Sequence, residues 1–132
     1  MNEVGVSQKA LIFYKEKFLV WKRGETAPSN PNKWDFPGGD MDFGENAYDS
    51  IKREIKEESG LNINELEPYD VYSKINNINN FWVTIAYKGE TDNDNVQLSY
   101  EHSDYKWVDL KEFNQLDVVE KIKIFVRKYY DQ

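Results

Sequence analysis

Short blocks of hydrophobic residues, separated by polar ones, mark the first third of the chain. The β-branched and aromatic runs at residues 9–14 and 18–23 are separated by three charged residues, which predicts a β-hairpin. Residues 24–33 collect Gly, Pro, Ser and Asn, and they are predicted to form a loop. A short extended segment is expected at residues 34–39, because Phe36 precedes a proline and is therefore biased away from helix.

The hydrophobic period changes to that of a helix between residues 45 and 59. Its apolar positions recur at every fourth residue, at Ala47, Ile51 and Ile55. Asn46 is placed to cap the start of this helix, and Gly60 is placed to end it. The segment is therefore predicted to be an amphipathic helix with one buried face.

The second half of the chain is predicted to contain strands followed by a helix. The strands are expected at residues 69–75, 80–89, 96–100 and 104–110, and residues 118–130 have apolar positions at helical spacing. The order of strands, helix, strands, helix predicts an α/β (α+β) fold with a mixed sheet sandwiched between helices. The absence of a repeat or a linker, and the length of 132 residues, indicate a single domain spanning residues 1–132.

Charge and composition exclude several classes of function. The net charge of -7, from 24 acidic and 17 basic residues, is a poor match for general nucleic-acid binding or for an anionic membrane. The chain contains no cysteine, so disulfides, thiolate chemistry and zinc–thiolate sites are excluded. No apolar run approaches membrane-spanning length, and no targeting segment is evident at the N-terminus. We therefore expect a soluble, cytoplasmic protein without a membrane partner.

Three glutamates share one face near the end of the predicted helix. Glu54, Glu57 and Glu58 are related by three- and four-residue spacing, and a solvated acidic face is one interpretation of them. However, the C-terminal end of a helix carries partial negative charge and favours basic residues. A bound divalent cation would remove the repulsion, and hard carboxylate oxygens suit Mg²⁺ or Mn²⁺ rather than zinc.

Two adjacent glycines precede this helix. Gly38 and Gly39 are consistent with a tight turn, or with a backbone that comes close to a ligand and offers a carbonyl to a metal. The residues alone leave both alternatives open.

The segment that runs from these glycines through the acidic helix resembles the signature of the Nudix hydrolases. That signature is G-x5-E-x7-R-E-U-x-E-E-x-G-U, in which U is aliphatic, and here it spans residues 39–61. Its fixed positions are filled by Gly39, Glu45, Arg53, Glu54, Ile55, Glu57, Glu58, Gly60 and Leu61. The preceding "WDFPGG" and the later "LSYEHSDYKWVDL" also look like segments common in this family.

The resemblance implies a Nudix fold and hydrolysis of a nucleoside diphosphate linked to another group X, with Mg²⁺ or Mn²⁺ as cofactor. Carried over by position, the metal ligands would be the Gly38 carbonyl, Glu54, Glu57, Glu58 and Glu101. Glu101 lies outside the signature, and an ordinary surface acid is the alternative interpretation of it.

The resemblance also implies roles beyond metal binding. Arg53 would pair with Glu45 and hold the helix against the preceding loop. Glu54 or Glu58 would accept the proton of the attacking water, with Glu101 as a further candidate. These residues form the expected catalytic set.

Substrate choice is less constrained by the sequence. Arg23 resembles a basic residue that contacts substrate phosphate in MutT-like members, and it is expected to bind substrate together with the backbone of Gly38 and Gly39. Asp40 departs from the lysine that many of those members have at this position. The preferred interpretation is a MutT-like nucleoside triphosphate pyrophosphatase. The alternative is a hydrolase of ADP-ribose or of a nucleotide sugar.

Two other classes are compatible with the same fold. Isopentenyl diphosphate isomerases usually depend on a cysteine, which this chain lacks. A non-catalytic nucleotide-sensing module typically has a degraded signature, whereas this one is complete. The expected partner is a small-molecule nucleotide. The sequence leaves the oligomeric state open, with a homodimer as one alternative because many relatives dimerise.

Overall fold

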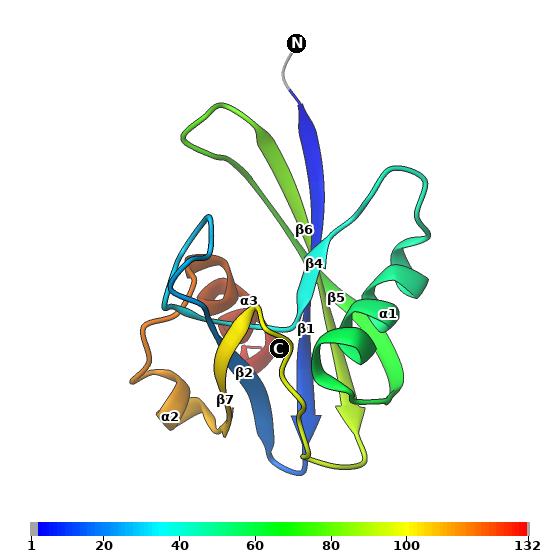
Figure 1. Ribbon diagram of the computed structural model, residues 1–132, viewed down its shortest axis with the longest axis vertical. Coiled ribbons are helices and arrows are strands. Elements are labelled where there is room, and N and C mark those ends of the chain that lie inside the picture. The colour runs from blue at the N-terminus through cyan, green and yellow to red at the C-terminus, as the bar shows by residue number, and fades with distance from the viewer. Residues whose placement is uncertain (1–2, 132) are drawn as a thin grey trace.

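A mixed β-sheet forms the centre of the molecule in the computed structural model, which describes residues 3–131 (Figure 1). The strands are β1 (Val4–Tyr14), β2 (Lys17–Arg23), β3 (Trp34–Asp35), β4 (Gly38–Asp40), β5 (Ile63–Ile75), β6 (Phe81–Thr91) and β7 (His102–Val108). The helices are α1 (Ala47–Ser59), α2 (Leu110–Phe113) and α3 (Glu120–Tyr130).

The sheet divides where β1 changes partner. The main path runs β3-β2-β1-β6-β5, β4 pairs with β1, and β7 pairs with β2. β1 meets β2 only near its end, where Phe13 pairs with Phe18, whereas Lys9 pairs with Gly38 of β4. β1 and β6 are parallel, and the other pairs are antiparallel. Between β2 and β4 the sheet therefore opens, and the candidate site lies at this opening.

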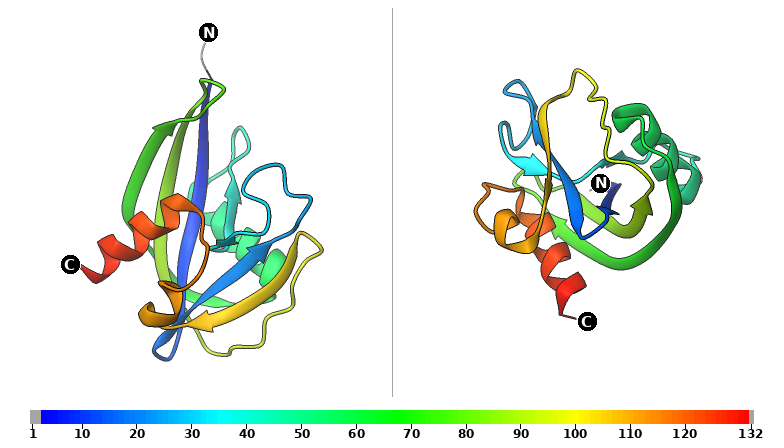
Figure 2. Two further views of the ribbon diagram at one scale, coloured as in Figure 1. Left: turned by 90° about the vertical axis from the view of Figure 1, so that its left-hand side faces the viewer. Right: turned by 90° about the horizontal axis from the view of Figure 1, so that it is seen from below.

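Helices cover both faces of the sheet, as the sequence predicted. Figure 2 shows α1 and α3 on opposite sides of the central strands. Successive residues of a strand point to opposite faces, so Ala10 and Ile12 pack with Ile51 and Ile55 of α1, while Leu11 packs with Phe125 of α3. The expected α/β (α+β) mixed sheet between helices is confirmed.

The ends of α1 follow the predicted capping. The Asn46 side chain accepts a hydrogen bond from the Asp49 N–H at 3.0 Å, so the helix begins at Ala47, two residues later than predicted. Gly60 ends the helix with φ 76°, and its N–H donates to the Lys56 carbonyl at 2.9 Å. A left-handed residue at this position is the usual helix stop.

The strand predicted at residues 96–100 is wrong. This segment is irregular, and its backbone bonds to the end of α1 instead of to the sheet. The Gln97 N–H donates to the Ser59 carbonyl at 2.9 Å, and the Ser99 N–H donates to the Glu58 carbonyl at 3.3 Å. The last carbonyls of a helix have no partner within the helix, so the segment satisfies them and fixes the end of α1.

The short helix α2 was not predicted from the sequence. It is held by a capping box, in which the Asp109 carboxylate accepts from the Glu112 N–H at 2.8 Å and the Glu112 carboxylate accepts from the Asp109 N–H at 3.1 Å. As for membranes, each helix in the described part of the chain is too short or too polar to cross one.

Gly60→Ala is expected to lower the free energy of unfolding by about 1 kcal/mol, because a Cβ is strained in the left-handed region. Gly60→Asn, the matched control, should lose less, since asparagine tolerates this conformation better. Denaturant unfolding of both variants checks the prediction. Equal losses in the two would contradict it.

Candidate active site

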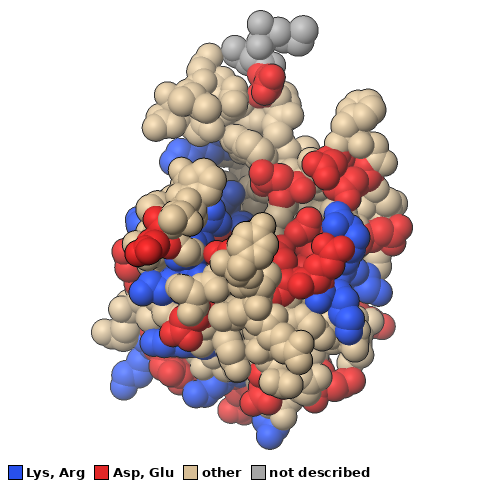
Figure 3. Space-filling view, in the orientation of Figure 1, with Lys and Arg blue, Asp and Glu red and all other residues tan. Residues whose placement is uncertain are grey.

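A charged pocket of about 230 Å³ lies at the opening in the sheet. Its charged lining residues come from six different segments, and they are Lys9, Arg23, Asp35, Asp40, Glu58 and Glu101. The backbone of Gly38 and Gly39 also lines it. On the face seen in Figure 3, acidic side chains gather on the side of α1, and basic side chains lie across a hollow from them.

The two glycines bring β4 close to its neighbours. A Cβ on Gly38 would collide with the backbone carbonyl of Gln8 on β1. A Cβ on Gly39 would lie 2.9 Å from Oε2 of Glu54 on α1, closer than real Cβ contacts come. Residues 38–40 form a strand rather than a tight turn, so the structure favours the alternative in which the backbone approaches other groups closely.

Glu54 and Glu58 come together at this border. A hydrogen bond joins their side chains, and the Glu58 side chain is only 13% exposed. Burial raises the pKa of Glu58 to about 9, with the hydrogen bond to Glu54 and repulsion from Glu54 and Glu101 adding to the effect. In the metal-free protein Glu58 therefore holds a proton at neutral pH.

Glu57 points to a different partner. Its Oε2 lies 3.3 Å from Nη1 of Arg53, and its side chain is 60% exposed. Arg53 also donates to Glu45 at 2.7 Å and lies 3.6 Å from Glu54. The expected contact between Arg53 and Glu45 is present, and the same guanidinium gathers two glutamates of the helix face.

Glu101 lies at the pocket in the turn before β7. It lines the pocket and contributes to the raised pKa of Glu58, so it lies near the helix carboxylates. Its backbone carbonyl accepts from the Gly24 N–H at 3.2 Å, which ties this turn to the end of β2.

His102 is a neutral group in this setting. Its ring lies 4.2 Å from the ring of Trp21, and its Nδ1 is 4.0 Å from Oε2 of Glu58. Burial lowers the pKa of His102 to about 4. With His102 unprotonated and Glu58 protonated at neutral pH, the contact between them is not an ion pair.

Lys9 and Asp35 were not identified as site residues from the sequence. Lys9 Nζ lies 2.7 Å from Oδ2 of Asp35, which is also 3.2 Å from Nη1 of Arg23. Burial acts to raise the pKa of Asp35, but the charge and hydrogen bond of Lys9 outweigh it and hold that pKa below its usual value. The sequence did offer one signal for them, because each is a charged residue within a buried strand.

The carboxylate set fits a hard divalent cation by its chemistry. The side chains that converge are oxygen donors, and Glu54 and Glu58 are held together at the cost of a retained proton. Within residues 3–131, however, no three acidic or histidine side chains already stand as a metal-ligand group. Glu57 would have to leave Arg53 to join such a group.

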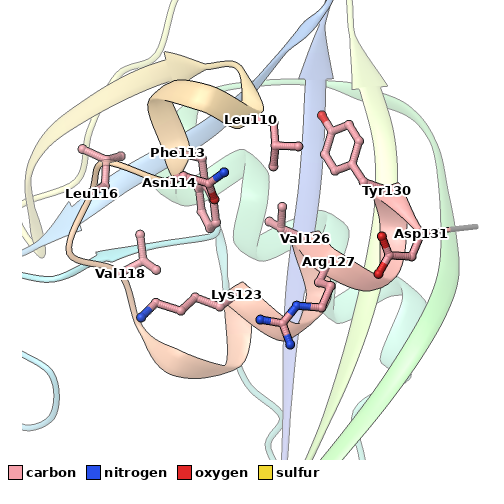
Figure 4. A pocket seen from close by; sticks show the side chains of 10 residues that line it. All are labelled: Leu110, Phe113, Asn114, Leu116, Val118, Lys123, Val126, Arg127, Tyr130 and Asp131. Carbon is pink, nitrogen blue, oxygen red and sulfur yellow. The ribbon is translucent and has the colours of Figure 1, made fainter.

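A second hollow lies away from these charges. A groove of about 330 Å³ separates α2 from α3, and Figure 4 shows Phe113 and Val126 in it with Lys123 and Arg127 beside them. Asp131 is the one acidic residue in its lining. The groove lacks the paired carboxylates of the charged pocket, so we place the candidate chemistry in the pocket.

Comparison with known proteins identifies the family and the fold. The NUDIX domain model matches residues 5–129. A MutT protein structure from Methanosarcina mazei Go1 aligns with TM-score 0.81 and 28% identity, covering 98% of this chain and 96% of that one. The Caenorhabditis elegans protein named bis(5'-nucleosyl)-tetraphosphatase (asymmetrical) is 26% identical, with 94% of each chain covered. The structure of a C. elegans Ap4A hydrolase binary complex aligns with TM-score 0.77 and 23% identity, covering 96% of each chain.

The mixed sheet between helices is thus shared with these proteins. The chain belongs to the NUDIX domain family. It is a Nudix hydrolase, and the resemblance seen in the sequence is confirmed.

The raised pKa of Glu58 predicts how stability depends on pH in EDTA. Between pH 4.5, the ordinary value, and about 9, the unfolded chain ionises Glu58 while the folded protein keeps the proton. Stability is therefore lost as pH rises through this window. The Glu58→Gln variant should lose less stability than wild type over this window. Its melting temperature minus that of wild type should therefore increase by about 3 °C or more from pH 5 to pH 9.

The matched control is Glu16→Gln, an exposed acid in the β1–β2 turn. Its melting curve should stay parallel to that of wild type when both are followed by circular dichroism. Parallel curves for Glu58→Gln as well would show that Glu58 ionises normally.

Proposed function

We propose that this protein is a pyrophosphohydrolase dependent on Mg²⁺ or Mn²⁺ that cleaves the diphosphate linkage of a nucleoside diphosphate derivative. The observation that carries the proposal is the pocket itself. It brings Glu58 and Glu101 into one lining with Lys9, Arg23 and the backbone of Gly38 and Gly39. Hydrolysis of a diphosphate needs both kinds of residue. The cations attract the phosphate oxygens, and the carboxylates accept a proton and bind the metal.

The residues that would hold the cation are Glu54, Glu57, Glu58, Glu101 and the Gly38 carbonyl. When bound, the ion would offset phosphate charge and lower the pKa of a coordinated water. Glu54 and Glu58 are the strongest members of this set, because their side chains already share a hydrogen bond at the pocket.

The chain's own groups account for the rest of the reaction. A carboxylate, Glu54 or Glu58 with Glu101 as a further candidate, accepts the proton of the attacking water. The water oxygen bonds to phosphorus, and the bond from phosphorus to the bridging oxygen breaks, so that the bridging oxygen leaves with its electron pair. Arg53 keeps the helix face and Glu45 together at 2.7 Å.

A nucleoside triphosphate is the preferred substrate. The 28% identity to the M. mazei MutT protein over nearly the whole chain supports this choice. The name of the C. elegans relative favours a second candidate, a dinucleoside tetraphosphate cleaved unequally. Asp40 in the pocket lining is evidence against a nucleoside triphosphate as substrate, because a carboxylate repels phosphate. ADP-ribose, nucleotide sugars and a purely sensing role are the remaining alternatives.

The test is turnover of these compounds with Mg²⁺ or Mn²⁺, with the products identified. Release of a nucleoside monophosphate and pyrophosphate would support a nucleoside triphosphate as substrate. Release of a nucleoside monophosphate and a nucleoside triphosphate from a dinucleoside tetraphosphate would support the second candidate. Glu54→Gln and Glu58→Gln should each lower kcat by about a hundredfold or more, since each removes a proton acceptor or a metal ligand.

Glu16→Gln serves again as the matched control and should keep wild-type kcat. Full activity in both Glu54→Gln and Glu58→Gln would place the chemistry elsewhere. Tight nucleotide binding without turnover of any compound would make the protein a sensor and would overturn the proposal.

A further inference from the structure

Asp35 is buried between two cations on the basic side of the pocket. Its side chain is 2% exposed, and Oδ2 receives both Lys9 Nζ at 2.7 Å and Arg23 Nη1 at 3.2 Å. Its other oxygen, Oδ1, accepts from the Phe36 N–H at 2.8 Å. Three donors, one from β1, one from β2 and one from the residue that follows β3, therefore fix the position of this one carboxylate.

Stability alone is a poor reason for such an arrangement. A buried ion pair loses hydration on both sides, and apolar residues of similar size often stabilise a core as well or better. Lys9 is followed on β1 by Ala10, Leu11 and Ile12, which are fully buried, so an apolar residue would suit this strand. Lys9 and Asp35 both line the pocket, so we infer that the charged pair has a role there rather than in stability.

Both cations keep unused hydrogen-bond donors. An ammonium has three N–H groups and a guanidinium has five. Lys9 uses one of its three, on Asp35. Arg23 uses Nε on the Ser29 carbonyl at 2.9 Å and Nη1 on Asp35, with Nη2 3.4 Å from the Ser29 hydroxyl. Its guanidinium is thus oriented on both sides while two N–H groups are left over.

The positive charge extends further along the same face. Lys121 of α3 places Nζ 3.4 Å from the Thr84 hydroxyl and makes no salt bridge within residues 3–131. Thr84 pairs with Ser7, two residues before Lys9 on β1, so Thr84 and Lys9 share a face of the sheet. Two carboxylates, Asp35 and Asp40, thus stand among three cations, so positive charge still outnumbers negative charge on this side of the pocket.

We propose that Lys9 binds the phosphate oxygens of the substrate beside Arg23, for which such a contact is already expected, and that Asp35 is the positioning residue that holds both cations in place. The site takes the charge of a di- or triphosphate chain. The identity of the nucleotide rests on the proposed function, whereas the binding of phosphate oxygens does not require turnover.

The test uses inorganic tripolyphosphate in EDTA, with binding measured by titration calorimetry. The central variant is the double substitution Lys9→Met/Asp35→Leu, which removes the buried pair without leaving one charge alone. It should fold, because the two apolar side chains can pack together, and it should bind tripolyphosphate at least about tenfold more weakly than wild type. Lys33→Met/Asp117→Leu removes an exposed ion pair of 3.8 Å and is the matched control.

Kinetics give a second readout wherever a substrate is turned over. The Lys9→Met/Asp35→Leu variant should raise KM by about tenfold while kcat changes by less than about threefold, as expected when binding alone is lost. Asp35→Asn, which keeps Lys9 but removes its anchor, should raise KM in the same direction. A purely structural pair would instead change the melting temperature and leave the KM of the folded protein unchanged.

Three results would overturn the inference. They are wild-type affinity for tripolyphosphate in the folded Lys9→Met/Asp35→Leu variant, an equal loss in the Lys33→Met/Asp117→Leu control, or no binding of tripolyphosphate by wild type in EDTA. Because these titrations contain no divalent metal and no nucleotide, they stand even if every candidate substrate fails.

Discussion

The close approach of β4 to its two neighbours is the constraint on which the site depends. Gly38 lies against the backbone of Gln8, so it has no room for a Cβ, and a Cβ on Gly39 would push the Glu54 carboxylate aside. β1 carries Lys9 on the face opposite α1, whereas the glutamates belong to α1 itself. The glycine strand is the border at which the two meet, and a bulkier strand would separate them.

Charge is then divided between the two sides of this border. A carboxyl group on one side has its pKa shifted in the opposite direction from a carboxyl group on the other. Lys9 holds the pKa of Asp35 low, whereas burial and Glu54 raise the pKa of Glu58 to about 9. One carboxyl is a permanent anion that orients cations, and the other is a proton carrier in the metal-free protein. Perturbed groups with opposite shifts in one pocket are typical of active sites.

Several parts of the fold could be predicted because local physics decides them. The stripe of Ile51 and Ile55, the cap at Asn46 and the stop at Gly60 depend on neighbours within a few residues. Predictions failed where distant groups decided the outcome. Residues 96–100 have the composition of a strand, yet their backbone bonds to the carbonyls at the end of α1, which no local pattern reports.

The sequence by itself determined the helix, its caps and the spacing that puts Glu54, Glu57 and Glu58 on one face, because a helix has a fixed period. Only the tertiary structure decided that Glu58 turns to the pocket while Glu57 is held by Arg53. It alone also joined Lys9 to Asp35, which are 26 residues apart and lie on strands that are not paired with each other. Contacts of that kind depend on how the sheet opens between β2 and β4, and strand pairing over such distances leaves no period in the sequence.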